Sequence, residues 1–210
     1  MRKLILQEFV SLDGLAAGTN DAVDFVPQAT KDDSSFGSEQ LELMNAIDTI
    51  LLGRVTYQLF AGYWPKVTEG KEKTFADKLN ATRKVVVSHT LDHAPWGSWR
   101  DATIVKGDPA PEVRTLKQQS GKDIVIWGSI SLAQSLMDED LIDEYRLVMC
   151  PIVLGAGRPL FREDLNTREL RLLQAKTFDR GAVLLKYSAA KQPASERREV
   201  AAGTARGSDR

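Results

Sequence analysis

Three short apolar runs limit what this chain can fold into more than any other feature. They occupy residues 49–52, 84–88 and 123–127. A continuous apolar run of this length suits a strand that is buried on both faces of a parallel sheet. Two of the runs end at a glycine, Gly53 and Gly128, and a helical pattern follows each of them. Strands that alternate with helices in this way predict an α/β domain with a mostly parallel central sheet.

The C-terminal part of the chain carries a different pattern. The turn sequence 179–181 separates two β patterns, which predicts an antiparallel C-terminal hairpin. Residues 1–190 are therefore predicted to form one domain, and residues 191–210, in which Val200 is the only large aliphatic side chain, a disordered tail. Further strands are predicted at 3–10, 102–106, 144–151, 170–178 and 182–187, helices at 40–47, from 54, at 71–80, at 109–119 and from 130, and a loop at 11–21.

The charge and the N-terminal segment exclude several classes of protein. The formal net charge is −1 and the basic residues are scattered among acidic ones, so the chain offers no attractive surface for nucleic acid. The apolar stretch at 4–6 is too short for a signal peptide or a membrane helix. We therefore expect a cytoplasmic protein that has neither a nucleic acid nor a membrane as its partner.

The few cysteines and histidines do not indicate a metal site. Cys150 is the single cysteine, so no internal disulfide can form, and its apolar surroundings predict a buried, unreactive thiol. His89 and His93 could bind a metal only if they lay on one helix. The strand pattern that runs into His89, and Pro95 beyond, favour a loop instead. We therefore predict no metal.

Polar groups follow all three apolar runs, where they could bind a ligand. Ligands of open α/β sheets bind at the carboxyl ends of the strands, and helix N-termini there attract phosphate. The alternative at each position is structural: a tight turn with a surface arginine, a polar strand cap, or close packing. The complete Gly-x-Gly-x-x-Gly sequence is absent, which disfavours a Rossmann dehydrogenase. The candidate residues are Gly53, Arg54 and Thr56 after the first run, Ser88, His89 and Thr90 in and after the second, and Gly128, Ser129 and Ile130 after the third.

The ordered combination of short motifs resembles one family. The whole set spans about residues 1–188 with suitable spacing, and it resembles dihydrofolate reductase-like proteins, in particular the reductase domain of riboflavin biosynthesis. The matching segments are Ser-Leu-Asp-Gly at 11–14, Leu-Gly-Arg-Val-Thr-Tyr at 52–57, Val-Ser-His-Thr-Leu at 87–91, Gly-Ser-Ile-Ser-Leu at 128–132, Asp-Glu-Tyr at 143–145, Pro-Ile-Val-Leu-Gly at 151–155 and Pro-Leu-Phe at 159–161.

This resemblance implies a fold, a cofactor and an activity. The fold would be a three-layer α/β domain, the cofactor NADPH, and the assembly a homodimer with possible contacts at the C-terminal hairpin. The reaction would be the reduction of a small heterocycle or ribosylamino-pyrimidine, with 5-amino-6-(5-phosphoribosylamino)uracil as the reference substrate. The resemblance further implies that Gly53, Arg54 and Thr56 hold phosphate, that Ser88, His89 and Thr90 meet the adenosine ribose, and that Gly128, Ser129 and Ile130 lie under the nicotinamide half.

The substrate side is less well defined by the sequence. Asp13 is the candidate catalytic residue, which could bind the substrate's polar ring or relay a proton, and the alternative is a simple turn at Asp13-Gly14. Gly14, Leu160 and Phe161 would line the substrate side with it. No spacing selects Asp32 or Asp33 as an acid that binds a pterin ring. The zinc deaminase signature of bifunctional relatives is absent, so a stand-alone reductase, an NADPH sensor without turnover and an inactive dimeric scaffold remain alternatives.

Overall fold

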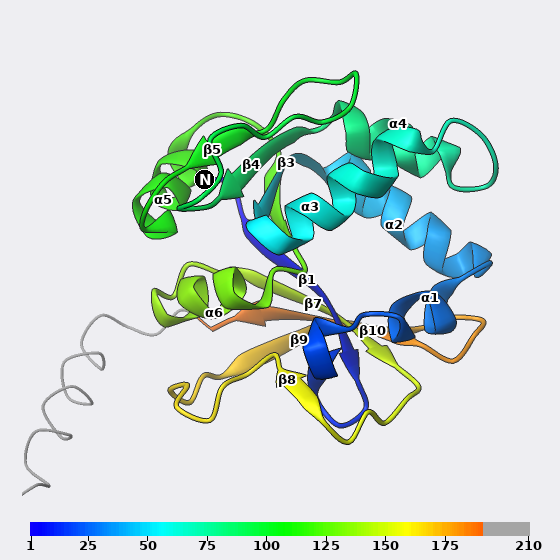
Figure 1. Ribbon diagram of the computed structural model, residues 1–210. Coiled ribbons are helices and arrows are strands. Elements are labelled where there is room, and N and C mark those ends of the chain that lie inside the picture. The colour runs from blue at the N-terminus through cyan, green and yellow to red at the C-terminus, as the bar shows by residue number, and fades with distance from the viewer. Residues whose placement is uncertain (191–210) are drawn as a thin grey trace, which may run out of the picture.

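The computed structural model describes residues 1–190, and an eight-stranded sheet runs through this region (Figure 1). Its strand order is β5-β4-β3-β6-β1-β7-β10-β9. All neighbours from β5 to β7 are parallel, whereas β10 is antiparallel to β7 and to β9. The strands are β1 (Leu4–Ser11), β3 (Ile47–Gly53), β4 (Arg83–Val87), β5 (Thr103–Val105), β6 (Asp123–Trp127), β7 (Glu144–Cys150), β9 (Leu170–Thr177) and β10 (Val183–Ala189).

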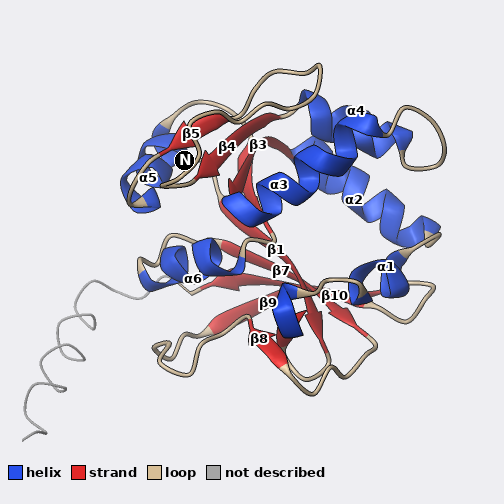
Figure 2. Ribbon diagram, viewed as in Figure 1, coloured by secondary structure: helices blue, strands red, loops and turns tan. Residues whose placement is uncertain are grey.

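Helices cover both faces of the parallel part of the sheet, which gives three layers (Figure 2). The alternation of side chains along the strands supplies one core on each face. On β1, Leu4 and Leu6 belong to the core under α5 and α6, whereas Ile5 belongs to the core under α2, α3 and α4. The helices are α1 (Phe25–Thr30), α2 (Ser34–Ala46), α3 (Arg54–Tyr63), α4 (Lys73–Ala81), α5 (Pro109–Gln118) and α6 (Ile130–Asp138), and two short 3₁₀ helices are η1 (Thr19–Asp21) and η2 (Trp64–Lys66).

The predicted fold is confirmed, including the mostly parallel sheet and the C-terminal antiparallel hairpin. The helix predicted at 40–47 was placed wrongly at both ends. It begins at Ser34, because the Asp33 carboxylate accepts the Phe36 N–H at 2.9 Å and caps the helix there. Ile47 is the first residue of β3, where it pairs with Asp123. The predicted tail at 191–210 lies outside the described residues.

A small second sheet lies within part of the chain that was predicted to be a loop. β2 (Leu15–Gly18) and β8 (Gly157–Pro159) pair antiparallel, although they are more than 130 residues apart in the sequence. Both strands are too short to show an alternating pattern. The pair joins the loop after β1 to the segment after β7, and α1 follows η1 in the same region (Figure 1).

No helix within residues 1–190 has the length and apolar character that crossing a membrane requires. The cytoplasmic location stays a prediction.

Gly157 should be required for this small sheet. Its φ is 155°, and an added Cβ would collide with the Ala17 carbonyl oxygen of β2. Gly155 has φ 74°, but an added Cβ would meet nothing within 4 Å, so it is a matched control. We expect Gly155→Ala to lower the free energy of unfolding by about 1 kcal/mol, from backbone strain alone. Gly157→Ala should lower it by about 3 kcal/mol. Urea unfolding of both variants measures this, and equal losses would contradict it.

Candidate functional site

A cavity of about 970 Å³ lies beside the carboxyl ends of four neighbouring strands. Glu8 and Phe9 of β1, Gly53 of β3, Val87 of β4 and Trp127 of β6 all line it. Cavities of this size are at the upper end of those that hold small molecules and cofactors. The cavity therefore occupies the place where open α/β sheets bind their ligands.

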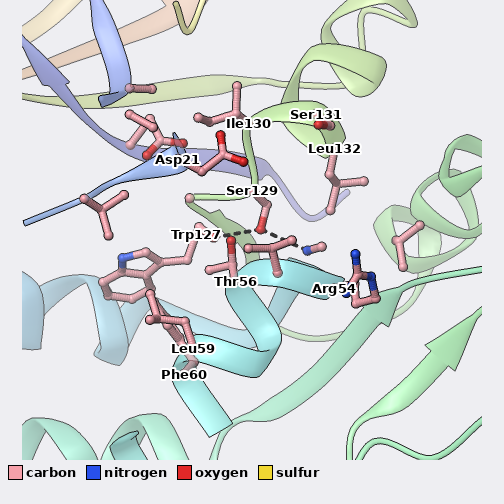
Figure 3. A pocket seen from close by; sticks show the side chains of 18 of the residues that line it. Asp21, Arg54, Thr56, Leu59, Phe60, Trp127, Ser129, Ile130, Ser131 and Leu132 are labelled. Atoms are coloured by element: carbon pink, nitrogen blue, oxygen red, sulfur yellow. Dashed lines mark hydrogen bonds between the residues drawn. The ribbon is translucent and has the colours of Figure 1, made fainter. Parts of the chain in front are cut away.

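Two helices begin at this cavity without a side-chain cap. The N-cap of α3 is Gly53, which has no side chain. The N-cap of α6 is Ser129, whose side chain accepts no hydrogen bond from an N–H group of that helix. The first turns of both helices line the cavity, so unpaired N–H groups and the positive ends of two helix dipoles lie at its wall. Figure 3 shows Arg54 and Thr56 of α3 on one side, Ile130, Ser131 and Leu132 of α6 on the other, and Ser129 between them.

The Ser129 hydroxyl group joins the two helix starts. Its Oγ accepts the Gly53 N–H at 2.9 Å and donates to the Trp127 carbonyl oxygen at 3.1 Å (Figure 3). Ser129 has φ 65° and follows Gly128 at φ 56°, so two successive residues adopt the left-handed conformation. An added Cβ on Gly128 would lie 3.4 Å from the Thr56 methyl group. The tight turn and the two bonds together fix the distance between the two helix N-termini.

Positively charged groups lie at this wall. Arg54 is exposed, and within residues 1–190 its only recorded side-chain hydrogen bond runs to Gln58 Oε1, at 3.2 Å. Arg158 of β8 also lines the cavity, where it pairs with Asp21 at 3.0 Å and donates to the Ser131 hydroxyl at 2.8 Å. Arg54 can thus turn to an anionic ligand without breaking an ion pair of its own.

The structure brings together most of the predicted cofactor residues. Ser88 and Thr90 are the exceptions, because the buried Ser88 Oγ accepts the Thr90 and Leu91 N–H groups and caps the end of its strand. The lining residues among the predicted set are Gly53, Arg54, Thr56, His89, Gly128, Ser129 and Ile130.

Asp13 does not lie among the lining residues of the cavity. Its carboxylate accepts the Ser11 hydroxyl at 2.6 Å and the N–H groups of Leu154 and Gly155. The hydrogen bond from Ser11 and those two N–H groups lower the pKa of Asp13 to about 2. This geometry favours a structural role over a proton relay. The Gly14 N–H donates to the Ser11 carbonyl oxygen at 2.9 Å, which forms the turn given as the alternative, and Asp13 ties this turn to residues 154–155.

The other predicted substrate residues also lie elsewhere. The Gly14 carbonyl accepts the N–H of Leu160, which is fully buried in the core. Phe161 packs beside Tyr145. Asp32 pairs with Lys71, and Asp33 caps α2, so neither reaches the cavity lining.

The sequence patterns missed the residues that line the other end of the cavity. The apolar residues among them include Phe9, Ala16, Val23 and Val26, and the acidic residues Glu8 and Asp21 also line the cavity. Val23 and Val26 follow a predicted loop, and no helical or strand periodicity in the sequence marked these two positions. Glu8 could have been found, because a carboxylate within a buried apolar strand is rare.

Glu8 is the most perturbed acid of the cavity. Glu8 is only 4% exposed, and burial raises the pKa of its carboxyl group to about 8. Oε1 accepts the N–H of the adjacent Phe9 at 3.1 Å, and Oε2 has no hydrogen-bond partner among the described residues. A buried carboxyl group in this state is protonated at neutral pH.

The described residues offer no cluster of three or more histidine, cysteine or acidic side chains for a metal. His89 and His93 lie in the non-helical segment after β4, as predicted. Cys150 is buried, and burial raises the pKa of its thiol to about 12, which fits the prediction of an unreactive thiol.

Comparison with known proteins identifies the family of this chain. Residues 2–184 match the RibD C-terminal domain, and the chain belongs to that family. The uncharacterized protein YyaP of Bacillus subtilis is 33% identical over 187 residues, which are 89% of this chain and 94% of YyaP.

Solved structures share the fold. A Shewanella sp. PV-4 protein, assigned provisionally to riboflavin biosynthesis, has a TM-score of 0.70 at 22% identity, with 91% of this chain and all of that chain covered. Dihydrofolate reductase from Enterococcus faecalis, in complex with NADP(H), has a TM-score of 0.57 at 11% identity, with 90% and 97% covered.

The raised pKa of Glu8 should make stability depend on pH. In the unfolded chain this carboxyl group titrates near 4.5, and in the folded protein near 8. Between these values only the folded state holds the proton, so the free energy of unfolding falls as pH rises. We expect a fall of up to about 1.4 kcal/mol per pH unit relative to Glu8→Gln. Urea unfolding of both proteins at pH 5.5, 6.5 and 7.5 measures it, and a constant difference would contradict it.

Proposed function

We propose that this protein is an NADPH-dependent reductase of a small heterocyclic or ribosylamino-pyrimidine substrate. The observation that carries the proposal is the pair of uncapped helix N-termini on one cavity, at the carboxyl edge of a parallel sheet. Two such N-termini suit the phosphate groups of a dinucleotide. The nicotinamide supplies the hydride when it is bound, and the protein supplies binding and orientation.

The positively charged wall would hold the phosphates. The first turn of α3 offers the N–H groups of Arg54 to Thr56, and Arg54 adds a guanidinium group that can form paired bonds with a phosphate. Gly128 and Ser129 would lie under the nicotinamide half, where their lack of bulk leaves room for a flat ring. His89, Val87 and Gly107 also line the cavity, and this part of it would hold the adenosine.

The apolar end of the cavity would hold the substrate. It is lined by Phe9, Ala16, Val23 and Val26, which exclude water from a reacting ring. The family supports a pyrimidine as the substrate class, and 5-amino-6-(5-phosphoribosylamino)uracil is the reference compound to test.

A titration with NADPH and, separately, with NADH tests the cofactor assignment. Nucleotide fluorescence and thermal shift should both report binding of NADPH with a micromolar dissociation constant. Oxidation of the bound NADPH by a pyrimidine would then establish the reductase, and binding without oxidation of any pyrimidine or pterin would point to a sensor. Lack of binding at millimolar concentrations of both nucleotides would overturn the proposal and leave an inactive scaffold.

Arg54→Ala should raise the dissociation constant of NADPH at least tenfold. The variant loses a charge-assisted hydrogen bond to phosphate, which is worth about 1.5–3 kcal/mol. Arg114→Ala is the matched control, because Arg114 is exposed on α5, pairs with Glu139 and does not line the cavity. Fluorescence titration measures both variants. An unchanged affinity in Arg54→Ala would remove this residue from the site.

We also propose that the protein is a homodimer that forms through β9. This strand is at the edge of the sheet, and its backbone groups on that side have no strand partner among the described residues. Leu172 and Leu173 of β9 are 52% and 45% exposed. An open edge with exposed leucines readily pairs with a second copy of itself.

The double variant Leu172→Lys/Leu173→Lys should therefore be a monomer. Two lysines on the edge oppose pairing by charge repulsion. Size-exclusion chromatography with light scattering should give the mass of two chains for the natural protein and of one chain for the variant. A natural protein that elutes as a monomer would rule out the β9 interface.

A further inference from the structure

Glu8 interrupts one face of an otherwise apolar strand. On β1, Leu4, Leu6 and Val10 lie on the same face and belong to the core under α5 and α6. Glu8 holds the position between Leu6 and Val10, where the pattern calls for another aliphatic side chain. A carboxyl group at such a position opposes folding unless it is paired, so its presence here calls for a reason other than packing.

The sheet divides at the level of Glu8. β1 pairs with β6 up to Gln7, which lies opposite Trp127, and the chain of β6 then turns away at Gly128. β1 continues to Ser11, and beyond Gln7 its only strand neighbour in the described part of the chain is β7. The gap that opens between β1 and β6 is part of the cavity, since Glu8, Phe9, Trp127 and Gly128 all line it.

At this gap, one of the two carboxyl oxygens of Glu8 has no hydrogen-bond partner among the described residues. Its Oε1 accepts the Phe9 N–H at 3.1 Å, which replaces the hydrogen bond that a continuing β6 would supply. Its Oε2 is buried and has no partner among residues 1–190. Glu8 is thus a lining residue of the cavity whose carboxyl group has one oxygen bonded to the backbone and one buried oxygen without a partner among the described residues.

Within residues 1–190, no cation forms an ion pair with Glu8. The titratable groups that line the same cavity are Asp21, Arg54, His89 and Arg158, and none of them is bonded to it. On β7 its neighbour is Leu147, and the cations Arg146, Lys176 and Lys186 are bound to Glu39. Burial without a cation keeps the Glu8 carboxyl group protonated, and therefore a hydrogen-bond donor, at neutral pH.

We propose that Glu8 is the proton donor to a neutral C=N substrate in this cavity, bonded through Oε2 to the imine nitrogen. This inference rests on the proposed reductase function and adds the substrate's reacting group to it. The substrate carbon accepts a hydride, which leaves the nicotinamide oxidised. The C=N π electrons move to nitrogen, which takes the Glu8 proton and becomes an amine. The Glu8 carboxylate that remains regains its proton from solvent.

The chemistry favours an imine over a carbonyl. A general acid is most effective when its pKa lies near the working pH, and that of Glu8 does. An imine nitrogen is basic enough to take a proton from such an acid, whereas a carbonyl oxygen is far less basic. The neutral form of Glu8 and the apolar lining beside it also select against anionic reacting groups.

Steady-state oxidation of NADPH tests this role with two neutral cyclic imines, 2-methyl-1-pyrroline and 3,4-dihydroisoquinoline, and with cyclopentanone as the carbonyl probe. The natural protein should reduce an imine faster than the ketone, with kcat falling above pH 8. In Glu8→Gln, kcat should drop about 100-fold and lose this pH dependence, while the dissociation constant of NADPH changes less than twofold. Glu69→Gln, at an exposed position outside the cavity, is the matched control and should match the natural protein.

Glu8→Leu separates this role from a structural one. Because leucine suits the apolar face, this variant should unfold at a higher temperature than the natural protein and bind NADPH, yet fail to reduce the imines. The proposal is overturned if Glu8→Gln keeps kcat within threefold, if both Glu8 variants are less stable than the natural protein, or if the NADPH-bound natural protein reduces neither imine. Failure of the natural protein to bind NADPH would instead overturn the proposed function, and this role with it.

Discussion

The hydrogen bonds of Ser129 set the geometry on which the candidate site depends. Its hydroxyl group accepts the Gly53 N–H and donates to the Trp127 carbonyl oxygen, so it joins the ends of two adjacent strands, β3 and β6. Each strand end is also the start of a helix. The positions of the two uncapped helix N-termini are therefore fixed relative to each other by one small side chain, which itself is held in a left-handed conformation. A turn of two glycines would allow the same backbone but would lack this bridge.

The sheet supplies the second constraint. While neighbouring parallel strands stay paired they leave no space for a ligand, and here they separate after Gln7 and Trp127. The uncapped starts of α3 and α6 line the cavity at that division, together with Glu8 and Phe9 of β1. The same division that opens the cavity also leaves the Phe9 N–H without a strand partner, and the Glu8 side chain takes over that bond. Backbone geometry and the unusual acid are thus parts of one local arrangement.

The sequence predicted the fold well because strands of the parallel sheet carry short apolar runs and helical patterns alternate with them. That the two helix starts lie at one cavity could be predicted for the same reason, since Gly53 and Gly128 directly follow two of those strands. The apolar part of the cavity could not be predicted. Its residues come from β2, η1, α1 and β8, which are too short to carry a periodic signal, and their pairing spans most of the chain. Asp13 illustrates the difficulty: a conspicuous motif carboxylate ties two loops together, whereas Glu8, which no motif marked, reaches the cavity.

The region of the small sheet formed by β2 and β8 differs from the main sheet in how well it tolerates amino-acid substitutions. Gly157 and the ion pair of Asp21 with Arg158 hold the β2–β8 sheet in place. None of these three residues belongs to either main core under the helices. Val23 lines the cavity and belongs to none of the core clusters of the described residues, so it can be exchanged for a larger or smaller side chain without disturbing the packing of the central sheet. Val26 differs, because it packs against a cluster that includes Cys150 of β7. In the proposed reductase, one scaffold of this kind would accommodate differently shaped substrates while the helix starts at Gly53 and Ser129 stay the same.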